Sequence, residues 1–540
     1  MSGDDEYRRL FEQSGLTRRE ALRGALAAGV LLGADGLLAA CGSEHVKVPT
    51  TNFGATSLEN VRRGGTLRVG VAGGGADDSI DAHKLATVPD ISRAFQLYEP
   101  LAGRNTASEF ELVLAESIEP EKRGAQTWTI RLRDGVTFHN GKPVTADDVL
   151  FSLGRIIDPK DPKTGAASIS YMDLKRSRKL DARTVRIQLK FPNVGFPDDL
   201  GQYFNSIVPT DYDPKKPVGT GPFKYDSFVP GERTVFVKNP DYWRDGLPRV
   251  DEVVIIDFPD DTPRLNALLS GQVDAITNLP PGQIAQVKSN DQFKVLISQT
   301  GGWQPFTMRV DKAPFDDVRV RQAMRLVVDR NQMISQVLSG QGRVANDLYS
   351  PYDPAYDHDL PQRKQDLDQA KSLLKQAGQA DLRVELVTSP VFQGIVEAAQ
   401  VIAEQAKGAG VAIKVRKVDP GTFYGDNYLQ WAFAQDFWAT RTYLSQVAQG
   451  SLPNSPFNET HWKDPEFLDL IAQARAELDD GKRTDLLKQA QKIEWDRGGL
   501  IVWSFSNQVD AYSTTVGGFH PARSGFPLSN YGFGSVGFVD

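Results

Sequence analysis

The chain has 540 residues, with 62 Lys and Arg against 69 Asp and Glu and a formal net charge of −7. This mildly acidic balance excludes a polybasic surface for nucleic acid or for anionic lipid. The chain has a single cysteine, which excludes an internal disulfide, so a chain long enough for about three domains depends on a buried hydrophobic core.

The N-terminal segment 16–43 has the pattern of an export signal. Arg18 and Arg19 precede an apolar run over 25–34, and small residues then lead to Cys41. The run is shorter than the roughly 20 apolar residues that a membrane-spanning helix needs. Contact with the membrane is therefore expected to depend on Cys41.

Two short stretches within this segment resemble known export motifs. Leu38-Ala39-Ala40-Cys41 resembles the lipobox of bacterial lipoproteins, and the stretch around the paired arginines resembles a twin-arginine motif. The resemblance implies that Cys41 carries a diacyl lipid and becomes the mature N-terminus. Two acyl chains are enough for stable anchoring. A thiol enzyme is then excluded, because no free cysteine remains.

Strands and helices alternate along the rest of the chain. Alternating apolar residues predict strands over 64–74 and 127–133, and Thr145 before Asp147-Asp148 predicts the start of a helix. Two further stretches predict the order strand, helix, strand: 253–258, 261–270 and 273–276, and then 382–387, 391–407 and 411–418. An amphipathic helix over 367–377 is predicted to end at Gly378. A crossover helix between strands implies a parallel pair, so the sequence predicts an α/β protein.

Several segments, in order, resemble the extracytoplasmic solute-binding proteins of peptide-type ABC transporters, the oligopeptide, dipeptide and nickel-binding family 5. They are "GGTLRVG" from 64, "YEPLAG" from 98, the stretch 115–156, the stretch 218–253, "ALLSGQVD" from 267 and the stretch 314–334. The resemblance covers nearly the whole chain after the export signal.

The resemblance implies a two-lobed periplasmic-binding-protein-like fold of type II with the ligand cleft between the lobes. Residues 1–40 would be the signal peptide and 41–63 a linker. The first lobe would combine 64–98, 205–298 and 498–540, with 99–204 as an extra domain, and 299–497 would form the second lobe. Such a fold binds its ligand by lobe closure.

The same resemblance implies a receptor and not an enzyme. Its expected partners are a small solute, an ABC permease with its ATPase, and the outer face of the cell membrane through Cys41. We expect a monomer without a cofactor, without a bound metal and without nucleic acid as a partner.

The stretch 431–462 is the most informative about the ligand. In peptide-binding members a tryptophan is followed three residues later by an aspartate that holds the α-ammonium group of the peptide, whereas here Trp438 is followed by Arg441. A planar guanidinium binds a carboxylate through two parallel hydrogen bonds. With Asn458-Glu459-Thr460, this arrangement resembles a subset of the family less tied to simple peptides. An amino-acid conjugate or an opine-like compound is therefore a plausible solute.

Five residues are the candidate ligand contacts: Arg441, Trp438, Tyr443, Trp303 and Asp436. The aromatic residues would provide stacking or wall surface, because such pockets are largely apolar with a few placed polar groups. The alternative is that Arg441 forms an internal ion pair with Asp436 and does not touch the ligand.

Two other functions are considered beside this one. A lipid-anchored hydrolase is disfavoured, because the six histidines are widely separated and neither a His-Glu-x-x-His nor a Gly-x-Ser-x-Gly motif occurs. A receptor for a metal chelate or haem on the same fold stays open, since a chelated metal needs few protein ligands.

Overall fold

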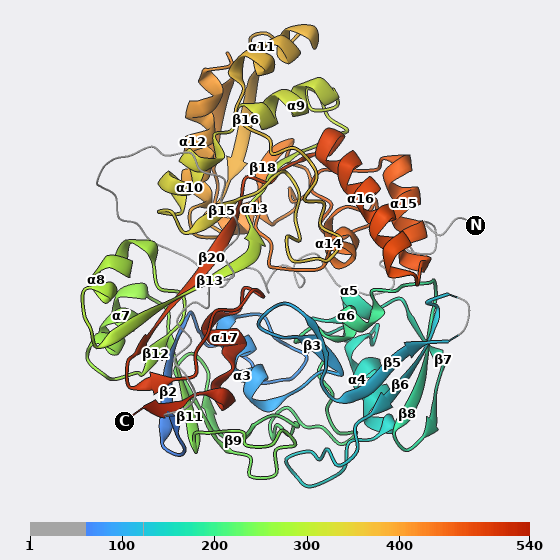
Figure 1. The fold of residues 1–540 in the computed structure, drawn as a ribbon, viewed down its shortest axis with the longest axis vertical. Helices are drawn as coiled ribbons and strands as arrows, with labels where there is room; N and C mark the ends of the chain where they lie inside the picture. Colours follow the sequence, from blue (N-terminus) through green and yellow to red (C-terminus); the bar gives the residue numbers. More distant parts are fainter. Residues whose placement is uncertain (1–60, 122–123, 540) are drawn as a thin grey trace.

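The computed structural model describes residues 61–121 and 124–539. The predicted export signal, with Arg18, Arg19 and Cys41, lies outside the described residues. Three main sheets form the architecture, an eight-stranded, a four-stranded and a five-stranded one, and each has its own buried apolar cluster (Figure 1).

The eight-stranded sheet has the order β13-β20-β12-β2-β11-β10-β9, and β15 adds to β20. Its strands are β2 (Thr66–Ala72), β9 (Phe223–Val229), β10 (Arg233–Lys238), β11 (Glu252–Phe258), β12 (Ala275–Ile276), β13 (Phe293–Trp303), β15 (Gly342–Val344) and β20 (Ser504–Ser513). Helices α3 (Val88–Leu97), α7 (Asp261–Leu269) and α8 (Ile284–Lys288) contact it. The predicted strands of 253–258 and 273–276 are parallel as expected, but β2 lies between them.

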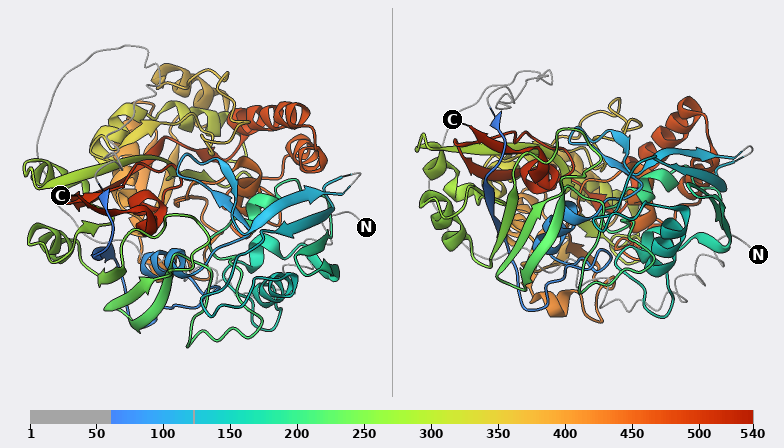
Figure 2. Two further views of the ribbon diagram at one scale, coloured as in Figure 1. Left: turned by 60° about the horizontal axis from the view of Figure 1, so that its bottom comes forward. Right: turned by 90° about the horizontal axis from the view of Figure 1, so that it is seen from below.

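The four-stranded sheet has the order β5-β6-β8-β7 and lies beside the eight-stranded sheet (Figure 2). Its strands are β5 (Ala115–Pro120), β6 (Thr127–Leu132), β7 (Met172–Asp181) and β8 (Thr184–Leu189), with α4 (Ala146–Ile156), α5 (Ala166–Ile169) and α6 (Phe196–Leu200) around it. The predicted strand at 127–133 and the helix after Thr145 are confirmed. Thr145 and Asp148 form a capping box, which explains why the helix starts there.

The five-stranded sheet has the order β17-β16-β18-β14-β19. Its strands are β14 (Phe306–Met308), β16 (Arg383–Thr388), β17 (Ala412–Lys417), β18 (Phe433–Gln435) and β19 (Leu500–Ile501). The predicted parallel pair β16 and β17 is confirmed. Its crossover helix α12 (Ile395–Lys407) begins later than predicted, because Gly394 has a φ of +80° and cannot continue a right-handed helix toward the N-terminus.

The remaining helices of this region flank the sheet or extend it at one end. They are α9 (Val318–Leu326), α10 (Arg330–Val337), α11 (Leu367–Gln376), α13 (Pro420–Phe423), α14 (Tyr443–Gly450), α15 (Pro465–Ala476) and α16 (Asp480–Arg497). The predicted helix over 367–377 is confirmed, and Gly378 follows it with a φ of +71°.

Small elements complete the fold near the C-terminus and the cavity. Strands β1 (Val61–Arg62), β21 (Val516–Gly517) and β22 (Gly537–Val539) form a separate sheet, and β3 (Ala102–Arg104) pairs with β4 (Phe110–Leu112). Short turns of helix are η2 (Pro281–Gln283), α17 (Pro527–Tyr531) and η3 (Phe533–Ser535).

Two long antiparallel strands, β13 and β20, run from the eight-stranded sheet toward the five-stranded one (Figure 1). Their register shifts between Gln299 and Trp303, where Gly301 and Gly302 lie. β14 follows β13 in the chain and belongs to the five-stranded sheet, so the chain passes between the two sheet regions here. Within the described ranges, no helix combines the length and apolar character needed to cross a bilayer.

Candidate functional site

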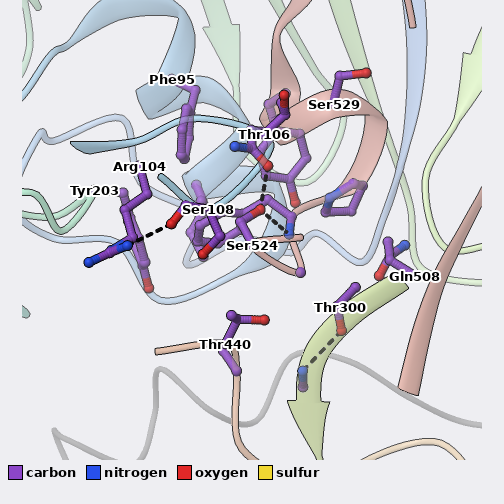
Figure 3. A pocket seen from close by; sticks show the side chains of 18 of the residues that line it. Phe95, Arg104, Thr106, Ser108, Tyr203, Thr300, Thr440, Gln508, Ser524 and Ser529 are labelled. Atoms are coloured by element: carbon purple, nitrogen blue, oxygen red, sulfur yellow. Dashed lines mark hydrogen bonds between the residues drawn. The ribbon is translucent and has the colours of Figure 1, made fainter. Parts of the chain in front are cut away.

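A cavity of about 730 Å³ lies where the three sheet regions meet. Its wall includes Phe95 of α3, residues within 103–111 and 198–203, and residues within 437–442 before α14. Figure 3 shows Tyr203, Thr440, Thr300 and Gln508 among the side chains that line the cavity. A cavity of this size with aromatic residues and a few polar groups is typical of a ligand site.

A column of four aromatic rings leads from the cavity into the protein. The ring centroids of Trp438 and Trp303 are 5.9 Å apart, those of Trp303 and Tyr349 5.3 Å, and those of Tyr349 and Tyr443 5.2 Å, all with nearly parallel planes. The backbones of Trp303 and Trp438 also exchange two hydrogen bonds, of 3.0 and 2.8 Å. Trp303 and Trp438 line the cavity, so its wall is supported by the rings stacked behind it.

Arg441 stands at the cavity end of this column. Its guanidinium carbon lies 5.6 Å from the ring centroid of Trp438, and the residue lines the cavity. Among the described residues the guanidinium has no partner in a hydrogen bond or ion pair. Burial lowers the pKa of Arg441, an effect that the nearby Tyr203 opposes. An arginine stays charged even so, and its donors are therefore available to a ligand.

Asp436 does not pair with Arg441. Its carboxylate accepts hydrogen bonds from the hydroxyls of Tyr424 at 2.7 Å and Tyr428 at 3.1 Å, and from the backbone N–H of Phe437 at 2.8 Å. Burial raises the pKa of Asp436. Asp436 is not among the described residues that line the cavity. The internal ion pair between Arg441 and Asp436 that was considered from the sequence does not form in the part of the chain that the structure describes.

Tyr443 lies at the buried end of the ring column. It is the first residue of α14, is 1% exposed, and donates its hydroxyl to Glu494 at 2.9 Å. Tyr349 donates to the same carboxyl group at 3.0 Å. The wall of the cavity, as far as the structure describes it, does not include Tyr443, whose contacts are those of a core residue.

A cluster of three aromatic residues that line the cavity, Phe95, Tyr203 and Phe526, was not predicted from the sequence. The ring of Phe95 lies 5.4 Å from that of Phe526, and Tyr203 contacts Phe526 edge-on at the same centroid distance of 5.4 Å. All three line the cavity. They come from segments more than 100 residues apart, and no local pattern distinguishes them from ordinary core aromatics.

The described residues contain no group of three or more His, Cys, Asp or Glu side chains placed to hold a metal ion. His520 lines the cavity, where Nε2 lies 3.0 Å from the Thr106 hydroxyl and Nδ1 lies 3.2 Å from the carbonyl of Gly518. Its two ring nitrogens are thus occupied by the protein.

Comparison with known families matches residues 109–451 to the bacterial extracellular solute-binding proteins, family 5 Middle. Di/tripeptide-binding protein 2 of Pseudomonas aeruginosa (strain UCBPP-PA14) is 27% identical over 482 residues, covering 82% of this chain and 89% of the relative. Heme-binding protein A of Haemophilus influenzae (strain ATCC 51907 / DSM 11121 / KW20 / Rd) is 28% identical over 472 residues, covering 80% of this chain and 85% of the relative.

Solved structures of similar fold extend over most of the chain. The periplasmic binding protein AgaA of A. tumefaciens R10, in complex with agropinic acid, matches with a TM-score of 0.73 and 23% identity over 88% of this chain and 99% of that one. This likeness confirms the two-lobed periplasmic-binding-protein fold that the sequence predicted.

Proposed function

The chain belongs to the bacterial extracellular solute-binding proteins of family 5, and from this premise we propose that it captures a small carboxylate-bearing solute for an ABC importer. The solute would be a peptide relative, such as an amino-acid conjugate or an opine-like compound. Proteins of this family are receptors, and they act outside the cytoplasm.

The observation that carries the proposal is Arg441 in the cavity without a hydrogen-bond or ion-pair partner among the described residues. Placing a charged side chain in a partly buried position without a counter-charge costs free energy. A ligand carboxylate that accepts two hydrogen bonds from the guanidinium recovers this cost on binding. Trp438 holds the guanidinium from one side through a cation–π contact, which keeps its donor edge directed and reduces the entropy lost on binding.

We propose that binding acts through lobe closure. The predicted boundaries assign 64–98, 205–298 and 498–540 to the first lobe, 99–204 to its extra domain and 299–497 to the second lobe. A ligand that contacts both lobes stabilises the closed form by its extra contacts there, and the permease would recognise that form. The register shift in β13 supports a bend at this point.

We also propose that Cys41 carries the lipid anchor, with export by the twin-arginine motif at Arg18 and Arg19, and that the receptor works as a monomer. Tethering raises the effective concentration of the receptor near the permease. Substituting Cys41→Ala should move the protein from the membrane fraction to the soluble extracytoplasmic fraction. A variant that stays in the membrane fraction would refute the lipid anchor at Cys41 but not the receptor function.

A thermal-shift screen of the purified protein tests the receptor function. The panel would hold short peptides, N-acetyl amino acids, opines, oligosaccharides, haem and chelated nickel. A ligand at 100 times its Kd adds about 2.7 kcal/mol to the native state, which gives a readily measured rise in Tm. Hits among peptides, N-acetyl amino acids or opines support the proposal, whereas hits confined to haem or chelated nickel would favour the alternative receptor for a metal chelate.

A further inference from the structure

The carboxylates that line the cavity are already bound by groups of the protein. Glu99 accepts hydrogen bonds from the hydroxyl of Thr220 at 2.9 Å, the hydroxyl of Tyr242 at 2.8 Å and the indole N–H of Trp243 at 2.8 Å. Burial raises the pKa of Glu99. A carboxyl group with three fixed donors is a poor site for the ammonium group of a ligand.

Two further carboxylates in the wall are neutralised by arginines. Asp198 pairs with Arg104 at 2.7 Å, and Glu111 pairs with Arg244 at 3.4 Å. Each pair contributes no net charge to the cavity. Since Arg104 also donates to the backbone carbonyl of Ser108, it has fewer donors left for a ligand.

The fourth carboxylate, Asp353, is bound at both oxygens. Oδ2 accepts the backbone N–H of Tyr443 at 2.7 Å, and Oδ1 accepts that of Ala355 at 2.8 Å. Tyr443 is the first residue of α14, so the charge of Asp353 lies at the positive end of that helix. Among the described lining residues, Arg441 is thus the charged group that the protein leaves without a hydrogen-bond or ion-pair partner.

Tyr203 lines the same cavity and lies near Arg441. Its hydroxyl has no hydrogen-bond partner among the residues that the structure describes, and its ring is fixed between Phe204 and Phe526. Burial raises the pKa of Tyr203 to about 12, although Arg441 acts in the opposite direction. The phenol is therefore neutral at physiological pH and can donate a hydrogen bond to an anion.

We propose that Arg441 and Tyr203, which both line the cavity and lie near each other, together bind one carboxylate of the ligand, and that the ligand carries no free ammonium group. This inference rests on the proposed function and narrows it to monoanions, such as N-acylated amino acids or peptides with a blocked amine. Two observations support it: Arg441 is the lining arginine without a hydrogen-bond or ion-pair partner among the described residues, and each described lining carboxylate already accepts hydrogen bonds or pairs with an arginine.

The test compares four forms of one compound with the full-length protein by titration calorimetry: Ala-Phe, N-acetyl-Ala-Phe, Ala-Phe amide and N-acetyl-Ala-Phe amide. The N-acetyl acid should bind tightest, and its amide about 30-fold more weakly, because the amide cannot accept two hydrogen bonds from a guanidinium as an anion. The free dipeptide should be about ten-fold weaker than the N-acetyl acid, since its ammonium loses water and each lining carboxylate is already held by hydrogen bonds or an ion pair of the protein.

Variants separate shared binding of the carboxylate from a structural role. Tyr203→Phe should weaken the N-acetyl acid about five-fold, the value of one hydrogen bond to a charged group, and leave the amide unchanged. Arg441→Lys should lose most of the preference for the acid over its amide, because a lysine is a point charge without the paired donors. Tyr225→Phe, on β9 and outside the cavity lining, is the matched control.

The outcomes are distinct. Tighter binding of the free dipeptide than of the N-acetyl acid would overturn the inference but leave the receptor function standing. If Asp353→Asn then removed the tighter binding of the free dipeptide, the ammonium group would be located at Asp353. A Tyr203→Phe variant that weakens acid and amide alike would refute the shared binding of the carboxylate. Failure of every carboxylate compound to bind would overturn both the inference and the proposed function.

Discussion

Two arginines of this protein, Arg93 and Arg441, occupy buried or half-buried positions with opposite surroundings. Arg93, on α3 below the eight-stranded sheet, is fully buried and forms ion pairs with Asp78 at 3.1 Å, Asp90 at 3.3 Å and Asp257. Arg441, in the cavity, has neither a hydrogen bond nor an ion pair to any described residue. The guanidinium of Arg93 thus forms its ion pairs within the fold, whereas that of Arg441 forms none with the described residues.

The two environments distinguish an arginine that stabilises the fold from one whose donors are available to a ligand. A buried arginine whose donors are all satisfied stabilises the folded chain, and its removal leaves carboxylates without a counter-charge. An arginine whose donors are unsatisfied costs the folded chain free energy and is maintained for what it binds. Replacing Arg93 should therefore lower the stability of the fold, whereas replacing Arg441 should lower the affinity for the ligand.

The largest effect is expected for Arg93→Ala. Three carboxylates would remain buried without their cation, which should lower the free energy of unfolding by about 3–5 kcal/mol. Denaturant titration measures this change, with Arg233→Ala on the exposed face of β10 as the control. A loss of less than about 1 kcal/mol in the free energy of unfolding would mean that the three carboxylates take up protons or water. The ion pairs of Arg93 would then contribute little to stability.

Arg441→Ala should show the opposite pattern. We expect a loss of about 2–5 kcal/mol in affinity for a carboxylate ligand, the usual effect of removing one partner of a buried charge pair. The free energy of unfolding without ligand should change by less than about 0.5 kcal/mol or should rise. Calorimetry and denaturant titration on the same preparation check both. A large loss of stability with unaltered affinity would assign Arg441 to structure.

Glu494 is a buried carboxyl group whose side-chain hydrogen bonds come from hydroxyls and not from a cation. Burial raises its pKa to about 7, from an ordinary value of 4.5. The folded state therefore binds more protons than the unfolded state between pH 4.5 and 7, and this residue makes stability fall as pH rises through that window. Glu494→Gln should remove this pH-dependent decrease in the free energy of unfolding, which is on the order of 2 kcal/mol. Unfolding titrations at about pH 5 and pH 8 compare both proteins, and parallel profiles would contradict the raised pKa.

The smallest effect is expected for Tyr443→Phe, which removes one hydroxyl from Glu494 and keeps the ring in its column. It should cost about 1 kcal/mol of stability and leave ligand affinity unchanged. Measuring Tm and Kd on the same variant distinguishes a core residue, which changes Tm alone, from a ligand contact, which changes Kd. Any change in Kd beyond a factor of two would return Tyr443 to the ligand site predicted from the sequence.

The sequence predicted elements with a local cause more accurately than the site. Alternation gives β6, the capping box gives α4 and Gly378 gives the end of α11, because each depends on neighbours in the chain. In the site, Arg441 and Trp438 could be proposed from their spacing, whereas Asp436 and Tyr443 are near them in sequence and yet contact the core.

The aromatic part of the wall that holds Tyr203 and Phe526 could not be predicted. Tyr203 and Phe526 reach the cavity through the packing of separate sheets, and their surroundings in the sequence resemble those of any buried aromatic residue. What marks Tyr203 as a candidate, a hydroxyl without a hydrogen-bond partner among the described residues, is a property of the folded protein and leaves no local pattern.

The small sheet at the C-terminus has a practical consequence for experiments on whole cells. Val61 of β1 and Val539 of β22 are register partners in an antiparallel pair, so both ends of the described fold leave from one spot on the surface. A fluorescent reporter fused to the C-terminus would therefore lie next to Val61, where the described fold begins. Fusions intended to report on ligand capture belong instead in an exposed loop of the five-stranded region, away from both ends of the described fold.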